Sequence, residues 1–212
     1  MSLKTYVYVD GFNLYYRALI VNPRYKWLDL KKLCESLLGP RHEIRKIKYF
    51  TARVSGKIDN NKPMRQAAYL RAIKAFIPEV EIIYGRFYSH YVSAPLAGTT
   101  PYKFVKIVKT EEKGSDVNLA VHLLNDAWLN LYDCAVVISN DSDLAESCRL
   151  VREQNKKQLG VICPDINPNT NPSKELIQHS SFVEKIRKGL LAASQLPDHI
   201  PGTNIYRPQE WQ

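Results

Sequence analysis

Four aspartates in three separate stretches of the chain could together form a metal site. They are Asp10, Asp116, Asp141 and Asp143. Several carboxylates held close together repel one another, and some of them must then take up protons. A hard divalent cation such as Mg²⁺ or Mn²⁺ removes this conflict, because it prefers oxygen ligands and keeps waters that leave room for a phosphate. These residue types therefore predict metal-assisted attack of water on a phosphate ester.

Two of the aspartates follow a stretch that predicts a buried strand. Residues 134–138 are small or apolar and include three β-branched side chains, which is typical of a strand covered on both faces. The pattern stops at 139–143, where Asp141 and Asp143 lie, and helical spacing runs from 144 to 151. In open α/β sheets, ligands bind outside the carboxyl ends of the strands. We therefore expect both acids at a binding edge.

The other two aspartates can reach the same edge. Residues 5–10 repeat the pattern of a strand that ends in an acid, Asp10, and Asn13 lies at the start of the helix that follows. Asp116 opens a helix predicted from 117 to about 131. A helix that packs back against a parallel sheet begins near the carboxyl ends of its strands. We expect Asp116 to face the same pocket and the amide of Asn13 to orient a water or a ligand there.

Each of these acids also has a purely structural interpretation. Asp141 can cap the helix that follows its strand, and Asp143 suits the first turn, where free N–H groups and the helix dipole favour negative charge. In the same way, Ser115 can cap the helix predicted from 117, with Asp116 in its first turn. Capping does not explain why four acids and an asparagine converge on one edge, so we favour the functional interpretation.

The rest of the chain alternates between predicted strands and helices. Further helices are expected at 28–38, 62–77, 174–178 and 182–195, and further strands at 44–54, 80–84 and 159–163. This alternation predicts the α/β class, with a parallel sheet and helices on both faces.

One stretch departs from the alternation. Residues 85–100 are irregular and aromatic, and they could form a hairpin with 102–108. With 212 residues, the chain is long enough for one such domain, which we place at 1–196. The polar, proline-rich remainder, 197–212, is expected to lie on the surface as an arm.

The formal net charge of +9 indicates an anionic partner. Nucleic acid is the commonest partner of this kind, and RNA or DNA would both fit, although solubility alone is the alternative. The candidate phosphate contacts are Lys103, Lys106, Lys109 and Lys113 on or beside the predicted hairpin, and Arg45, Lys46 and Lys48 on the second strand. Aromatic side chains that could stack unpaired bases are Tyr15, Tyr16, Tyr88 and Tyr91, although core packing is the commoner role.

The cysteines and the hydropathy pattern bear on the cellular compartment. Cys34, Cys134, Cys148 and Cys163 form no Cys-x-x-Cys motif, and most fall in apolar runs, as expected of free thiols in a reducing cytosol. No apolar run approaches the length of a membrane span, and no signal-peptide pattern precedes the first strand. We expect a cytoplasmic protein without a membrane partner, and the oligomeric state is left open, a homo-oligomer included.

Three sequence blocks carry a resemblance to a known family. Residues 8–14, 112–118 and 139–144 resemble, in order and in separation, the signature blocks of the NYN domain. This is a group of PIN-like nucleases, and the chain is most similar to its bacterial LabA-like branch. The similarity extends from about Lys4 to Gln195.

The resemblance implies a PIN-like, Rossmannoid fold and a nuclease site dependent on Mg²⁺ or Mn²⁺, with RNA as the usual substrate. The implied acidic tetrad is Asp10, Asp116, Asp141 and Asp143, with Asn13 as the companion polar residue. Some related bacterial proteins are described instead as hydroxylases of pyridine compounds.

The sequence thus predicts a metal-dependent ribonuclease that acts on RNA, in particular single-stranded RNA. Two alternatives stay open. One is a nucleic-acid-binding module that keeps the acidic site without turnover. The other is an NADH-dependent hydroxylase of a pyridine-type small molecule, for which the sequence offers neither a Gly-x-Gly-x-x-Gly turn nor a two-histidine, one-carboxylate pattern.

Overall fold

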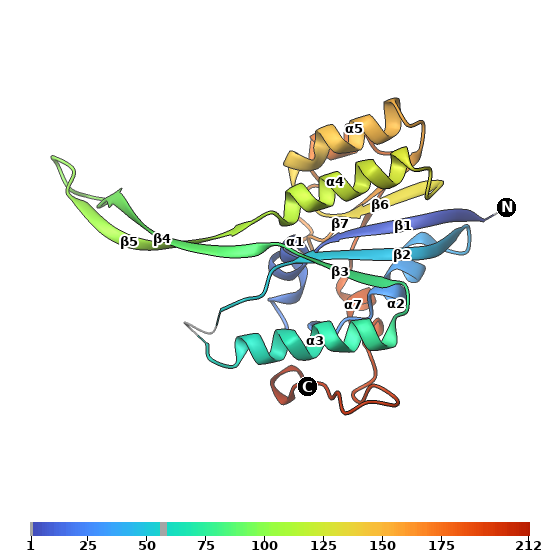
Figure 1. Cartoon of the computed structure of the whole chain (residues 1–212), viewed down its shortest axis with the longest axis horizontal. Coiled ribbons are helices and arrows are strands. Elements are labelled where there is room, and N and C mark those ends of the chain that lie inside the picture. The colour runs from blue at the N-terminus through green and yellow to red at the C-terminus, as the bar shows by residue number, and fades with distance from the viewer. Residues whose placement is uncertain (1, 56–58) are drawn as a thin grey trace.

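A six-stranded sheet forms the centre of the computed structural model, which describes residues 2–55 and 59–212 (Figure 1). Every pair of neighbouring strands is parallel, and the strand order is β3-β2-β1-β6-β7-β8. The strands are β1 (Leu3–Asp10), β2 (His42–Thr51), β3 (Val80–Tyr84), β6 (Cys134–Ile138), β7 (Gln158–Cys163) and β8 (Phe182–Lys185). The α/β fold with a parallel sheet, predicted from the sequence, is confirmed.

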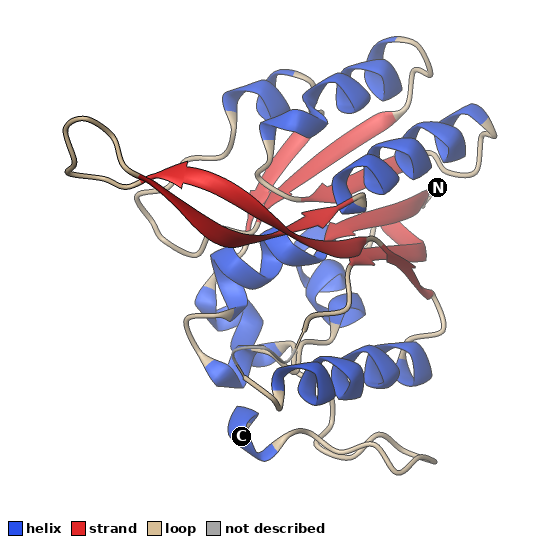
Figure 2. Ribbon diagram, turned by 60° about the vertical axis from the view of Figure 1, so that its left-hand side comes forward, coloured by secondary structure: helices blue, strands red, loops and turns tan. Residues whose placement is uncertain are grey.

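Helices cover both faces of this sheet (Figure 2). One face packs against α1 (Gly11–Leu14), α2 (Leu30–Leu38), α3 (Lys62–Phe76) and α7 (Lys188–Ala193). The other face packs against α4 (Ser115–Trp128), α5 (Ala145–Glu153) and α6 (Lys174–Gln178). Side chains alternate along a strand, so Val7 and Val9 of β1 enter the first core and Tyr8 enters the second. None of the helices in the described part of the chain has the length and apolar character needed to cross a membrane.

One predicted element is wrong. The sequence predicts a helix over 182–195, but the structure places the sixth strand, β8, at the start of this stretch, and only α7 is helical. Phe182 pairs with Gly160 of β7, and its ring fills the space in which a β-carbon on Gly160 would lie. This contact with a distant strand overrides the helical spacing of the local sequence.

Two antiparallel strands leave the body of the protein as a long hairpin, which projects to the left in Figure 1. β4 (Arg86–Pro95) pairs with β5 (Phe104–Lys113) over its whole length. The predicted hairpin is therefore confirmed, although its second strand extends five residues beyond the predicted end at Val108. The hairpin ends immediately before α4, so it emerges beside the carboxyl edge of the sheet.

The C-terminal segment, expected as a surface arm over 197–212, runs beneath α3 (Figure 1). Most of it is exposed, but Ile200 and Trp211 are buried. The indole of Trp211 packs against the rings of Trp27 and Tyr69, with centroids 6.3 and 6.5 Å apart. The segment therefore contributes to the core as well as to the surface.

The placement of Lys48 on the predicted phosphate path is wrong. Its side chain is 8% exposed, and its Nζ lies 2.6 Å from a carboxylate oxygen of Asp126 in α4. The hydroxyl of Tyr8 donates to the same oxygen at 2.7 Å, and Nδ1 of His122 lies 3.1 Å from Nζ. A buried ion pair depends on such additional hydrogen bonds, because both charges have left water. Lys48 thus fastens β2 to α4 inside the protein.

Replacing Asp126 by alanine should destabilise the protein strongly, because Lys48 would remain buried without its counterion. Removing one partner of a buried pair typically costs about 3–5 kcal/mol, which urea unfolding followed by circular dichroism would measure. The control is Asp198→Ala. The side chain of Asp198 is 75% exposed in its ion pair with Arg207, and a loss of about 1 kcal/mol or less is expected. Equal losses in both variants would contradict the proposed importance of the buried pair.

Candidate functional site

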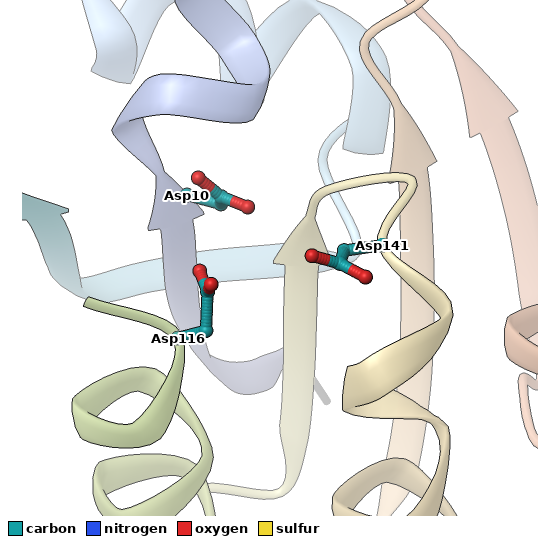
Figure 3. Close-up of side chains that lie close together, drawn as sticks. All are labelled: Asp10, Asp116 and Asp141. Atoms are coloured by element: carbon teal, nitrogen blue, oxygen red, sulfur yellow. The ribbon is translucent and has the colours of Figure 1, made fainter. Parts of the chain in front are cut away.

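Three aspartates from three different elements meet at the carboxyl edge of the sheet (Figure 3). Asp10 ends β1, Asp116 lies in the first turn of α4, and Asp141 follows β6. One oxygen from each carboxylate lies within 4.8 Å of the other two. Figure 3 shows the side chains directed toward one another. The convergence predicted from the sequence is therefore present for these three acids.

Asp10 is held in place by hydrogen bonds to both of its oxygens. The side chain is buried at 3% exposure, because β1 lies between β2 and β6. Oδ1 accepts from the backbone N–H of Asn13, and Oδ2 accepts from the hydroxyl of Ser139, both at 2.9 Å. Burial raises the pKa of Asp10, and these two hydrogen bonds oppose that effect. Asp10 thus caps α1 and at the same time presents its carboxylate to the cluster.

The pKa of Asp116 is raised by its surroundings in the cluster. Desolvation by the surrounding protein, together with the charges of the neighbouring acids, Asp10 first among them, raises its pKa to about 6. The side chain still reaches solvent. The part of this shift that comes from neighbouring acids reflects negative charge at the site, and a divalent cation is a species that would balance it.

Asp141 combines the capping role with membership of the cluster. Its Oδ1 accepts from the backbone N–H of Asp143 at 3.1 Å, at the start of the 3₁₀ turn Ser142–Leu144. Its own backbone N–H donates to Ser139 Oγ at 3.1 Å. The two interpretations of this acid, as a cap and as a ligand, are therefore compatible.

Asp143 lies outside the group of three. It is exposed in the first turn of the 3₁₀ segment, and its charge is the smallest of the named contributions to the pKa of Asp116. The sequence suggests a tetrad because the two acids of the Asp-x-Asp pair follow the same strand. Asp141 adopts an extended conformation, with φ of −88° and ψ of 118°, and the chain turns after it. Of the two acids, only Asp141 therefore joins Asp10 and Asp116.

The capping of α4 by Ser115 that the sequence suggests is wrong. Ser115 instead binds Glu112, an acid of the site that the sequence reasoning missed. The cap of α4 is Gly114, whose φ of 98° lies in the left-handed region that favours glycine. Ser115 instead donates from its backbone N–H and its hydroxyl to Glu112, at 3.2 and 2.7 Å. Glu112 lines the acidic cavity. Its position in the second signature block was the available signal.

Asn13 contributes to the site mainly by joining its parts. Its side-chain oxygen accepts from the backbone N–H of Asn140 at 3.1 Å, so it ties α1 to the loop that carries Asp141. Asn140 also donates to Asp165 at 2.9 Å, and Arg17 binds the same carboxylate at 3.0 and 3.2 Å. Sequence reasoning missed Arg17 and Asp165, which come together only in the folded chain.

The acids open into a cavity of about 500 Å³. Asn13 and Glu112 line it together with the cluster, and Phe12, Tyr16 and Phe87 form aromatic walls. Arg17 is the one basic side chain among its lining residues in the described part of the chain. A site of this kind can hold a cation at its base and a phosphate above it.

The hairpin lysines are exposed but do not share one face. Residues paired across the two strands lie on the same face, so Lys106, opposite Ser93, lies on the face that carries Phe87 and Glu112 at its base. Lys109 lies on the other face with Lys113, and both pair with Glu111, at 2.7 and 3.3 Å. Lys103 precedes β5.

The remaining predicted contacts lie away from the cluster. Arg45 and Lys46 pair with acids on the sheet, at 2.8 Å from Glu43 and 3.3 Å from Glu81. Tyr88 and Tyr91 are exposed on the hairpin, at 56% and 78%. The structure therefore separates the predicted site into an acidic centre and a distant basic and aromatic extension.

Comparisons with known proteins agree with this architecture. Residues 4–184 match the family model of the NYN domain. The chain is similar to 6-hydroxy-3-succinoylpyridine 3-monooxygenase HspA of Pseudomonas putida (strain DSM 28022 / S16). The identity is 32% over 236 aligned positions, which cover 99% of this chain and 75% of the relative.

A solved structure shares the fold. It is the crystal structure of VPA0982, a protein of unknown function from Vibrio parahaemolyticus RIMD 2210633. The TM-score is 0.54 and the sequence identity 16%, and the match covers 88% of this chain and 94% of the other. At this identity the likeness bears on the fold alone. The match of residues 4–184 to the family model also shows the family: the chain belongs to the NYN domain family of the PIN-like nuclease superfamily.

Proposed function

We propose that this protein is a metal-dependent nuclease that hydrolyses RNA, with Asp10, Asp116 and Asp141 as the ligands of Mg²⁺ or Mn²⁺. The observation that carries the proposal is the approach of three carboxylates to within 4.8 Å of one another. Membership of the NYN family supports it. The donor set fits the metal, because hard divalent cations prefer carboxylate oxygens and need few protein ligands.

The bound cation would supply charge neutralisation at the phosphate and a water of lowered pKa. The protein residues prepare the site for this chemistry. Ser139 and the N–H of Asn13 fix the orientation of Asp10. The exposed carboxylate of Asp143, two residues from Asp141, would be available to accept a proton from water. Arg17 lines the same cavity, and its guanidinium would have donors left for a phosphate oxygen while Nη1 stays on Asp165.

RNA, in single-stranded form, is the proposed substrate. The cavity is open rather than closed around a small molecule, so a strand can pass through it. The hairpin face that continues from Phe87 and Glu112 carries Lys106 and the exposed rings of Tyr91 and Phe104. Aromatic side chains and a cation along one path are the features that bind unpaired nucleotides. A cytoplasmic location and DNA as a further partner stay predictions.

A second candidate function is hydroxylation of a pyridine-type small molecule. The observation that favours it is the 32% identity, over 99% of this chain, to a protein named for that activity. Oxygen uptake in the presence of NADH and 6-hydroxy-3-succinoylpyridine would test it. Uptake that depends on the pyridine compound, together with no cleavage of RNA, would replace the nuclease proposal.

The metal proposal predicts opposite effects of pH with and without the cation. In EDTA, the folded protein holds a proton on Asp116 more tightly than the unfolded chain does, since the folded pKa is about 6 and the ordinary value is 3.8. The free energy of unfolding should therefore rise as the pH falls from about 7.5 to about 5.5. Mn²⁺ should raise the melting temperature at about pH 7.5 and less at about pH 5.5, because protons compete with the metal.

Differential scanning calorimetry of the wild type and of Asp116→Asn would measure both effects. The variant should be more stable than the wild type in EDTA at neutral pH, because the repulsion is relieved. It should also lose most of the shift caused by Mn²⁺. An undiminished shift in Asp116→Asn would show that the cation binds elsewhere.

Replacing Asp141 by asparagine should separate binding from cleavage. The shape is kept and one negative charge is removed from a cavity that must admit a polyanion, so RNA should bind at least as tightly in EDTA. With Mg²⁺ or Mn²⁺ present, cleavage should be slower by roughly a hundredfold, which corresponds to the loss of about 3 kcal/mol of transition-state stabilisation.

Filter binding and cleavage of labelled RNA would measure these quantities, with Asp198→Asn as a control acid far from the site. Unchanged cleavage by Asp141→Asn would mean a contaminating nuclease or a different site. Binding without cleavage by the wild type would favour the nucleic-acid-binding module instead.

The two hairpin faces predict different effects of lysine substitutions. Lys106→Gln should lower the slope of log affinity against log salt concentration by roughly one unit, as expected for one lost phosphate contact. Lys109→Gln, on the opposite face and paired with Glu111, is the matched control and should change the slope less. Equal slopes for Lys106→Gln and the wild type would exclude this face of the hairpin from the RNA path.

A further inference from the structure

A second cavity adjoins the acidic one and has a different chemical character. It lies between the first helix and α3 and has a volume of about 90 Å³. Aromatic side chains form its walls: Phe12, Tyr15, Tyr16, Tyr49, Tyr69 and Trp211. Phe12 and Tyr16 also line the acidic cavity, so the two spaces share a wall.

Hydrogen bonds fix the walls of this aromatic cavity. The hydroxyl of Tyr69 donates to the backbone oxygen of Leu28 at 3.0 Å, and the ring packs against Trp211. The side chain of Gln66 holds the segment after β2 at two points, by accepting from Val54 N–H at 3.0 Å and donating to Ala52 O at 2.9 Å. Walls that are ordered in advance reduce the entropy lost when a ligand binds.

Tyr49 contributes a hydroxyl to the aromatic lining. The residue is 6% exposed, and its hydroxyl is not among the fully buried polar atoms without a partner in the described part of the chain, so it keeps some access to solvent. Burial raises the pKa of this phenol, so it stays protonated and able to donate at neutral pH. A phenol hydroxyl in the wall of a mostly apolar cavity can donate to an acceptor on a ligand.

Positive charge gathers at the rim of the same cavity, on Lys26, Lys62 and Arg65. Burial lowers the pKa of Lys26, and the charges of Arg65 and Lys62 lower it further, so these cations lie close enough to repel one another. Asp59 and Glu210 neutralise Arg65. The ammonium of Lys26 lies over the ring of Tyr15, 5.5 Å from its centroid. An anion would relieve this repulsion.

We propose that the aromatic cavity binds a planar six-membered ring that carries an anionic group, with the ring among the tyrosines and the anion at Lys26 and Lys62. The small volume favours a single ring over a fused pair. Two sources share this chemistry. One is a pyrimidine nucleotide of an RNA strand whose next phosphate lies in the acidic cavity, and this source rests on the proposed function. The other is a free aromatic carboxylate, which does not.

Calorimetric titrations in EDTA would test the proposal on the intact chain. The ligands are uridine 5′-monophosphate, its fragments uridine and inorganic phosphate, and pyridine-3-carboxylate as the free aromatic acid. The nucleotide should bind at least about tenfold more tightly than either fragment, because the ring and the anion are held at once. If neither uridine 5′-monophosphate nor pyridine-3-carboxylate binds, the proposal is overturned.

Three variants assign the binding to this cavity. Lys26→Gln combined with Lys62→Gln should weaken nucleotide binding by about tenfold or more and leave the affinity for uridine unchanged. Tyr49→Phe keeps the shape and should weaken both ligands by a few-fold, as expected for one lost hydrogen bond. Lys74→Gln, at the exposed last turn of α3, is the matched control. Wild-type affinity in the double lysine variant, with its fold verified by circular dichroism, would overturn the anion site.

Competition distinguishes the two sources. If a short oligouridylate displaces the nucleotide and pyridine-3-carboxylate binds more weakly, the ligand belongs to an RNA strand. If pyridine-3-carboxylate binds more tightly and the oligomer does not compete, the ligand is a free aromatic acid.

These titrations contain no metal and involve no turnover, so their outcome is independent of the nuclease proposal. A protein that binds the nucleotide but cleaves no RNA would leave the cavity assignment standing. A protein that cleaves RNA but binds neither uridine 5′-monophosphate nor pyridine-3-carboxylate would support the nuclease proposal and overturn the cavity assignment.

Discussion

The constraint on which the site depends is the parallel pairing of β1 with β6. In this register Val9 lies opposite Ile138, so the next residues, Asp10 and Ser139, come together where both strands end. The hydroxyl of Ser139 then holds Asp10, and the chain turns so that Asp141 faces inward. A shift of one residue in this register would turn Asp10 to the opposite face of the sheet. The pairing of the two strands thus brings Asp10 and Asp141 to one place, and hydrogen bonds to their carboxylates then fix the side chains.

This arrangement carries an electrostatic cost that the fold tolerates. Asp10 and Asp116 both have raised pKa values, because they are partly removed from water and face other negative charges. The protein as a whole is strongly basic, with a net charge of +9, yet few cations are placed to neutralise the cluster. Arg17 lies nearby but is already bound to Asp165. The negative charge of the acids is therefore not balanced by protein cations, which is typical of sites that bind a positively charged ligand.

The features that could be predicted from the sequence are those with local patterns. Asp10 and Asp141 could be predicted because each follows an apolar run typical of a strand. Asp116 could be predicted because it begins an apolar helix, and such helices begin at the edge where the strands end. The features that could not be predicted depend on distant partners. Lys48 is buried because it pairs with Asp126, which lies 78 positions away in the chain. Strand β8 forms because an edge of β7 is free to pair with it. Likewise, nothing near Trp211 in the sequence indicates that it closes an aromatic cavity.

The fold alone does not decide between hydrolysis and hydroxylation, since one fold can carry several chemistries, and here a relative is named for the second. The surroundings of the acids bear on the choice. Asp116 reaches solvent, and the cavity that it lines with Asp10 and Asp141 is open. Water is a reactant in phosphodiester hydrolysis, whereas oxygen chemistry on a ring gains from excluding it, because water consumes reactive intermediates. The aromatic space lies next to the acids instead of around them, and the two cavities share Phe12 and Tyr16. An arrangement in which a ring is held among the tyrosines and an ester is presented to the acids fits hydrolysis of a nucleotide strand better than reaction at the ring itself.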